Sequence, residues 1–271
     1  MILFCIPAGG TNPFAPWSRR LRADIRLHIL DLPGRGRKIR QQPLTDLNAI
    51  LPTLAEEIRQ TCGEGESYML FGYCSGGIVA YELCRYMQQT GAPLPGQVFL
   101  FGIGAPDRLQ SHGEGAADTP EFRQMLEQFF TPESMGSEAA AAQAADAYLS
   151  AYRQSPEVSF SQVFPELSEE TEFEKTQLLF LLGGALQQIA QDNTMLEQYR
   201  LRQQEPVVLP TTGILGFGTE DTFVPKEDVL EWTRRFCSRS APSLWSLRLS
   251  LFEIRIASYR NFHCSASQSI L

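Results

Sequence analysis

Long hydrophobic runs are missing from this 271-residue chain. Nowhere do the roughly 18 apolar residues that a membrane-spanning helix needs follow one another. The amino-terminal stretch MILFCIPAGG has no basic leader and no small-residue cleavage site, so a secretory signal is not expected either. These absences predict a cytoplasmic protein that does not use a membrane as a partner.

Closely spaced cysteine pairs are also lacking. Without a secretory leader or zinc-type spacing, the six cysteines indicate neither a disulfide framework nor a metal site. We expect reduced thiols, no metal and no dissociable cofactor. The cysteines are Cys5, Cys62, Cys74, Cys84, Cys237 and Cys264.

Positive charge is scarce in the chain as a whole. The net charge of -8 argues against a nucleic-acid partner. Residues 1–40 run the other way, with a local balance of +6, which fits either a solvated surface or a docking patch for an acidic partner. The basic residues of this stretch are Arg19, Arg20, Arg22, Arg26, Arg35, Arg37, Lys38 and Arg40.

Short apolar segments alternate with helical patterns in the first hundred residues. This rhythm predicts βαβ units and a mainly parallel sheet in one core. Strands are expected at Ile2–Ile6, Arg26–Leu30, Tyr68–Phe71 and Gln97–Phe101, with helices at Asp46–Gln60 and Gly77–Gln89. The rhythm resumes later with a strand at Ile214–Phe217, a helix at Lys226–Arg235 and a last strand at Leu251–Ala257.

The strand rhythm stops between these two parts. Residues 105–206 are helical in pattern and acidic, as in EAAAAQAADAYLSAYRQ. We therefore predict a core of residues 1–104 and 207–271 with a helical lid inserted at 105–206. Such insertions often cover the strand ends where ligands bind, although a helical packing layer without a gating role would have the same pattern.

One stretch combines a strand, a glycine turn and a helix start. It is FGYCSGG, residues 71–77, which has the spacing of the Gly-x-Ser-x-Gly nucleophile elbow with Cys74 in place of the serine. The following helix places its positive end at the sulfur and favours thiolate. The pattern predicts that Cys74 is a nucleophile on an α/β-hydrolase fold, a mainly parallel sheet with helices on both faces.

A cysteine nucleophile normally needs a base, because a free thiol is mostly protonated at neutral pH. The chain has only three histidines. His28 lies in an expected strand and His112 at the start of the predicted lid, so we expect neither to be the base. His263 follows the last predicted strand, as the chain order nucleophile, acid, histidine requires.

The acid of that order is expected after the strand Ile214–Phe217. Asp221 stands there in the sequence GTED, with Glu220 as its competitor. We favour Asp221, which would orient His263 and stabilise its charged form.

An oxyanion hole needs two backbone N–H groups. One is expected from Ser75, the residue after the nucleophile. The other is expected from the loop PAGG after the first strand, where Ala8 is the first choice and Gly9 the second.

Several of these pieces together resemble the type II thioesterases that accompany nonribosomal peptide and polyketide synthetases. The matching stretches are LFCIPAGG, FAPWSRRL, LDLPGRGRK, LFGYCSGGIVAYELCRYM, TMLEQYR and GILGFGTEDTFVP, in family order from residue 3 to about 232. The resemblance implies an α/β-hydrolase with a helical lid that acts on acyl or aminoacyl thioesters of carrier proteins. It also implies that the carrier protein supplies the phosphopantetheine arm, which gives the basic stretch a purpose in docking.

The chain departs from that family in its nucleophile, loop, lid and tail. Cys74 replaces the usual serine, the PAGG loop lacks a bulky residue, and the lid is longer. The final family element survives only loosely as LFEIRIASYRNFHC, with Asn261 near the usual glycine position. Either an insertion around CSRSAPSLWSLRLS or an altered carboxy-terminal sequence accounts for the tail, and the second alternative leaves His263 without a role.

The resemblance favours hydrolytic editing through a Cys74 acyl-enzyme by a monomer. The cysteine favours transfer, because exchange between thioesters is nearly balanced in energy and an acyl group on Cys74 can pass to a second carrier. A non-catalytic carrier-binding subunit is the third alternative. Dienelactone hydrolases share a similar cysteine elbow, but PAGG and PGRGR argue against that class.

Overall fold

The computed structural model describes residues 1–8, 14–63, 65–109, 123, 126, 130–154, 188–202, 206–218, 221, 224–237, 243–250 and 253–258. Among the predicted site residues, Gly9, His112, Glu220 and His263 lie outside these ranges, as does Asn261. In the part that is described, no helix is both long and apolar enough to cross a bilayer.

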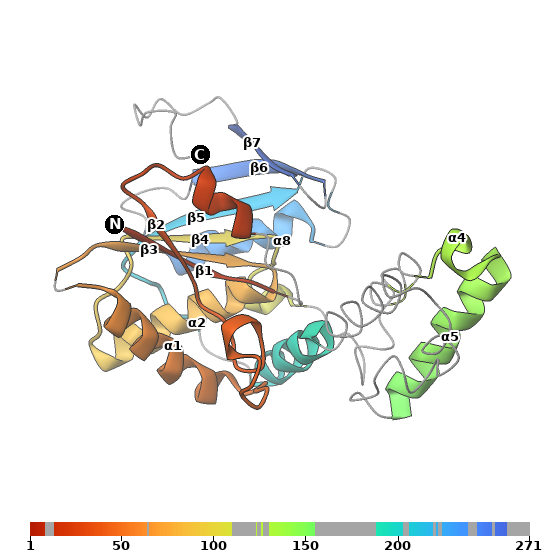
Figure 1. The fold of residues 1–271 in the computed structure, drawn as a ribbon. Helices are drawn as coiled ribbons and strands as arrows, with labels where there is room; N and C mark the ends of the chain where they lie inside the picture. Colours follow the sequence, from red (N-terminus) through yellow and green to blue (C-terminus); the bar gives the residue numbers. More distant parts are fainter. Residues whose placement is uncertain are drawn as a thin grey trace.

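A seven-stranded sheet with the order β2-β1-β3-β4-β5-β6-β7 forms the centre of the molecule (Figure 1). All neighbouring pairs are parallel except β6 and β7, which confirms the mainly parallel sheet. The strands are β1 (Ile2–Ile6), β2 (Arg26–Ile29), β3 (Tyr68–Tyr73), β4 (Gln97–Phe101), β5 (Thr212–Gly218), β6 (Ser243–Ser250) and β7 (Glu253–Ser258).

Helices fill the connections between the strands. Asp46 begins the first long helix as its N-cap, where its carboxylate accepts the Asn48 N–H at 2.9 Å. The α-helices are α1 (Leu47–Thr61), α2 (Ser75–Thr90), α4 (Pro132–Met135), α5 (Glu138–Gln154) and α8 (Lys226–Leu230), and residues 188–201 are helical as well. The 3₁₀ helices are η1 (Ala15–Arg19), η2 (Gly36–Lys38), η3 (Pro106–Arg108) and η6 (Glu231–Arg235).

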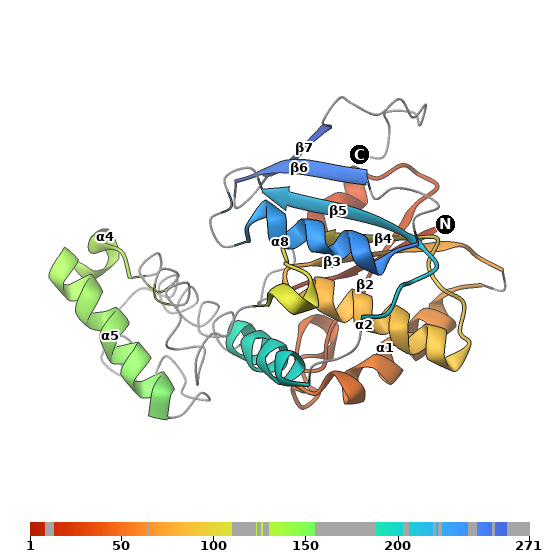
Figure 2. The same cartoon turned by 180° about the vertical axis from the view of Figure 1, so that it is seen from behind.

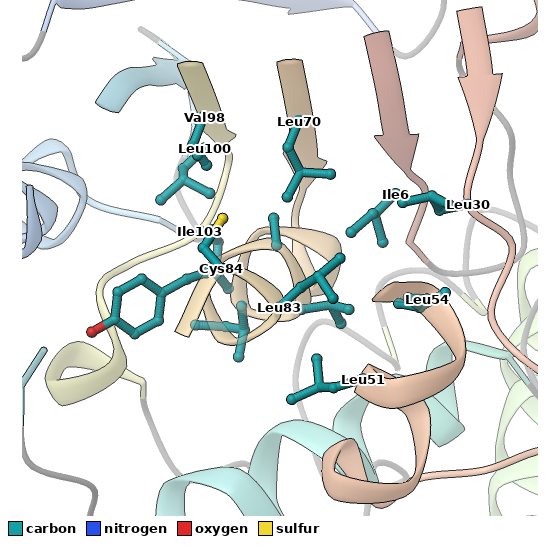
Figure 3. Close-up of a cluster of buried hydrophobic side chains, with 14 of the residues drawn as sticks. Ile6, Leu30, Leu51, Leu54, Leu70, Leu83, Cys84, Val98, Leu100 and Ile103 are labelled. Carbon is teal, nitrogen blue, oxygen red and sulfur yellow. The ribbon is translucent and has the colours of Figure 1, made fainter. Parts of the chain in front are cut away.

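The sheet is covered on both faces. On one face α1, α2 and α8 pack over a large apolar core, part of which is shown in Figure 3, where Leu51 and Leu54 of α1 face Ile6 and Leu70 of the sheet. On the other face Phe14 and Trp17 near η1 stack edge-on against Phe71. Figure 2 shows the molecule from behind, with α2 and α8 beside the sheet. Because both faces are covered, strands such as β1 are apolar throughout.

The carboxy-terminal hairpin differs from the sequence expectation. A single strand was predicted at Leu251–Ala257, whereas β6 and β7 pair as antiparallel strands. The sequence signal for β6 was the alternation in SLRLS, where Leu247 and Leu249 alternate with Ser246, Arg248 and Ser250. It was missed because the serine-rich surroundings resemble a loop.

The described part of residues 105–206 contains only helices and short connections. In Figure 1, α4 and α5 lie to one side of the sheet, whereas the helix of residues 188–201 lies against the core. Met195, Leu196 and Tyr199 of that helix belong to the same apolar cluster as α1 and α2. The division into core and lid stays a prediction, and this last helix contacts the core directly.

The amino-terminal end of α2 packs very tightly against the sheet. A Cβ atom on Gly76 would come within 2.3 Å of the Ile6 carbonyl oxygen, and one on Gly72 within 2.4 Å of the Gly76 oxygen. A Cβ on Gly77 would meet the Ile103 side chain at 2.5 Å. Two of these contacts are with backbone atoms, which have no rotamer to change, so the elbow needs glycine here.

We predict that Gly76→Ala destabilises the fold by about 2 kcal/mol, since overpacking outweighs the better helix propensity of alanine. Gly63→Ala is the matched control, because the nearest atom to its Cβ is a flexible Glu66 oxygen at 3.7 Å. Urea unfolding of the three proteins measures the difference. Equal midpoints for Gly76→Ala and Gly63→Ala would contradict the tight packing.

Candidate active site

Cys74 occupies a strained turn between β3 and α2. Its φ of 51° and ψ of -130° make it the sole non-glycine residue with positive φ among those described. Such backbone geometry costs about 1–3 kcal/mol and persists only where the surroundings enforce it. The Cys74 N–H donates to the Phe101 carbonyl, and the Cys74 carbonyl accepts the Gly77 N–H, both at 2.8 Å. The predicted elbow geometry is therefore present.

The elbow lies where the strand order reverses. From β1 the chain goes first to β2 on one side and then to β3 on the other, and ligands bind at such switch points at the carboxyl ends of strands. Ile6 at the end of β1 pairs with Gly72 of β3. Ala8, which is 8% exposed, therefore follows a strand end that borders the elbow. Its role as an oxyanion donor stays a prediction.

Ser75 points away from the solvent-exposed position of Cys74. It is 2% exposed, and its hydroxyl donates to the Asp192 carboxylate at 2.6 Å. The hydroxyl is thus engaged inside the protein, which argues against Ser75 as a displaced nucleophile. Its backbone N–H interacts with Cys74, as an oxyanion donor at this position would.

The surroundings of Cys74 oppose thiolate formation. Burial among protein atoms, followed by the charge of Asp192, raises the pKa of the Cys74 thiol to about 11. The hydrogen bond from the Ser75 N–H at the helix start lowers the pKa, as the sequence suggested, but it is outweighed, and the charge of Asp221 raises the pKa further. The residue as a whole remains exposed, so reagents and substrate have access to it.

Asp221 lies beyond the end of β5, and its charge acts on Cys74 and Tyr73. One oxygen of its carboxylate accepts the Val224 N–H at 3.0 Å, which fixes the orientation of the side chain. This is the placement expected for the acid of a triad. Whether Asp221 orients His263 stays a prediction, because His263 lies outside the described residues.

His28 has a structural role. Its ring packs edge-on against Phe4 at a centroid distance of 5.2 Å, and its Nε2 is 2.8 Å from Glu57. It lies on β2, whose strand end is separated from the elbow by β1. The expectation that His28 is not the base fits this placement.

The basic stretch of residues 19–40 is largely neutralised within the protein. Five of its members have carboxylate partners: Arg22 with Asp24, Arg26 with Glu66, Arg35 with Asp192, Arg37 with Asp31 and Glu57, and Lys38 with Glu57. Arg19, Arg20 and Arg40 are exposed and have no ion pair with the described residues. The surface available for an acidic partner is therefore smaller than the sequence suggested.

Sequence reasoning missed Asp192 as a neighbour of the elbow. It reaches Ser75 and Arg35, although it lies 117 and 157 residues from them along the chain. Asp192 stands two residues before the family-like stretch TMLEQYR, but nothing local marks a buried carboxylate. Among the described residues, no three His, Cys, Asp or Glu side chains are grouped to hold a metal ion.

Known proteins support the fold and the family. The gramicidin S biosynthesis protein GrsT of Aneurinibacillus migulanus is 33% identical over 106 residues, 38% of this chain and 41% of that protein. The linear gramicidin dehydrogenase LgrE of Brevibacillus parabrevis is 24% identical over 82% of this chain and 70% of its own length. The chain thus spans less than half of GrsT.

Solved structures agree with this picture. ClbQ from the colibactin NRPS/PKS pathway has a TM-score of 0.60 at 20% identity, covering 92% of this chain and 86% of ClbQ. The type II thioesterase YbtT has a TM-score of 0.58 at 22% identity, covering 90% and 83%. Both support the α/β-hydrolase fold. The thioesterase domain family matches residues 1–200, and the chain belongs to that family, with a cysteine at the tip of its elbow.

Proposed function

We propose that this thioesterase hydrolyses acyl or aminoacyl thioesters held on the phosphopantetheine arm of carrier proteins, through an acyl-enzyme on Cys74, in nonribosomal peptide or polyketide biosynthesis. The observation that carries the proposal is the positive φ of Cys74 on a glycine-packed elbow. A buried structural cysteine such as Cys84 needs no such backbone. The pathway names of GrsT, ClbQ and YbtT support the biosynthetic setting.

In the proposed reaction His263 takes the proton of the Cys74 thiol, and the sulfur attacks the thioester carbonyl. The N–H groups of Ser75 and Ala8 receive the negative charge that develops on the oxygen. The new bond is the Cys74 thioester, and the bond that breaks releases the carrier thiol, which takes the proton from His263. Water then repeats the sequence and frees the acid, while Asp221 stabilises the charged histidine.

Transfer to a second carrier is the alternative that the cysteine favours. A thiol acceptor regenerates a thioester with little change in energy, whereas a serine acyl-enzyme would first form an oxygen ester. In this reading the second carrier thiol takes the place of water in the last step. A non-catalytic carrier-binding subunit is the other alternative, and it predicts no covalent adduct.

We expect wild-type protein mixed with an acyl-loaded carrier to gain the mass of the acyl group at Cys74 in intact mass spectrometry. Cys74→Ala should gain none, because it lacks the sulfur. Cys74→Ser should react at least about 10²-fold more slowly, since a hydroxyl is a weaker nucleophile than a thiol at this position. A wild type that stays unlabelled and neither releases free acid nor transfers the acyl group would overturn both catalytic alternatives.

The fate of the label separates hydrolysis from transfer. With an empty second carrier present, hydrolysis predicts free acid and an unlabelled acceptor. Label that leaves Cys74 and appears on the second carrier would replace hydrolysis by transfer. A free lactone substrate serves as the control for the dienelactone hydrolase class and should not be consumed.

The raised pKa of Cys74 predicts how its alkylation depends on pH. Because the pKa of Cys74 lies above that of a free thiol, little of the thiol is ionised at pH 7, and without a base the rate should rise about tenfold per pH unit. If His263 is the base, wild-type Cys74 should react with iodoacetamide more than tenfold faster at pH 8 than Cys74 of His263→Ala. Peptide mapping distinguishes Cys74 from the exposed Cys237. Identical pH profiles would exclude His263 as the base.

A further inference from the structure

A buried chain of three side chains joins the elbow to two distant segments. Asp192, in the helix of residues 188–201, accepts the Ser75 hydroxyl at 2.6 Å and pairs with the Arg35 guanidinium at 2.5 Å. Arg35 also donates to the Gln188 carbonyl at 3.1 Å. Ser75, Asp192 and Arg35 are 2%, 4% and 6% exposed, so the surrounding solvent barely reaches these groups.

Stability alone is a poor explanation for this chain. A buried ion pair gains little over apolar packing of the same volume, because both charges lose their hydration. Within the part of the chain that the structure describes, Arg35 Nε and Nη1 are buried without a hydrogen-bond partner, which adds to the cost. The arrangement also places a carboxylate where it disfavours ionisation of Cys74. The effect of these linked side chains is on geometry, since they fix the position of Ser75, the residue after the predicted nucleophile.

We propose that Asp192 is a positioning residue for the thioester reaction, holding Ser75, and with it the peptide N–H that follows Cys74, while Arg35 holds the Asp192 carboxylate. The inference rests on the proposed function of Cys74. Ser75 is the first residue of α2, where the N–H has no partner within the helix and interacts with the Cys74 side chain, beside which an oxyanion would form. A side chain fixed by a charged hydrogen bond restricts the rotation of that peptide group.

Several separate contacts hold the rest of this helix against the core. Tyr199 donates to Glu82 of α2 at 2.6 Å, and Arg202 pairs with Asp46 at 2.9 Å just beyond the helical residues. Met195 and Leu196, which stand between Asp192 and Tyr199 in the sequence, lie in the apolar core. Asp192 is therefore presented by an element that is fastened to the core beyond it, and the predicted lid segment ends in direct contact with the elbow.

Two variants separate geometry from charge. Ser75→Ala removes the hydroxyl but leaves the Arg35–Asp192 pair, so it should lower kcat about tenfold with KM changed less than about twofold, and leave the alkylation profile of Cys74 unshifted. Asp192→Asn should lower kcat similarly. Because it also removes a negative charge that raises the pKa of Cys74, it should speed alkylation severalfold at pH 8. The double variant should have a kcat no lower than that of the more impaired single variant, since both substitutions break the same Ser75–Asp192 hydrogen bond.

Glu82→Gln is the matched control. It also removes a buried carboxylate that joins α2 to the same helix. Glu82, however, lies in the middle of α2, eight residues after Cys74. We expect a lower melting temperature with kcat and Cys74 alkylation close to those of the wild type. If Asp192→Asn fails to fold, Ser75→Ala still decides the matter, because it preserves the buried ion pair.

The outcomes are distinguishable from those of the proposed function. Failure of that function would show as a wild type that forms no adduct on Cys74. Failure of this inference would show as an active wild type in which Ser75→Ala and Asp192→Asn keep kcat within twofold of Glu82→Gln. A kcat loss in all three variants that follows their melting temperatures would likewise reduce Asp192 to a structural role.

Discussion

The rest of the site depends on the close approach of the α2 backbone to the end of β1. At this point the Gly76 backbone lies so near the Ile6 carbonyl that no side chain fits between them. Cys74, two residues before Gly76, has a positive φ. The same approach places Pro7 and Ala8, which follow Ile6, near the start of α2. The tight packing thus brings the predicted nucleophile and the predicted oxyanion donors to one place.

Electrostatics at the elbow acts against the nucleophile. Burial, Asp192 and Asp221 favour the neutral thiol, and the Ser75 N–H opposes them only in part. A raised thiol pKa is the situation in which a cysteine nucleophile needs a neighbouring base. The same carboxylate that disfavours ionisation also holds Ser75. Asp192 thus affects both the position of Ser75 and the ionisation of Cys74.

Much of the core was predictable because its signals are local. Strands β1 and β4 match the predicted ranges, Asp46 caps α1 at the start of the predicted helix Asp46–Gln60, and Cys74 has the predicted elbow geometry. Apolar runs, capping residues and glycine spacing are properties of neighbouring residues, so they can be found without coordinates. The strand β6 was missed because its alternation is short and lies among serines.

The sequence by itself determined the elbow, the succession of strands and helices along the chain up to the hairpin and the excess of acidic residues. Only the tertiary structure decided which charges are used internally. It pairs most of the basic stretch with carboxylates and brings Asp192 to Ser75 across 117 residues. The reason is physical: periodicity and glycine spacing act over a few residues, whereas a buried ion pair depends on which distant segments the packing of the sheet brings into contact.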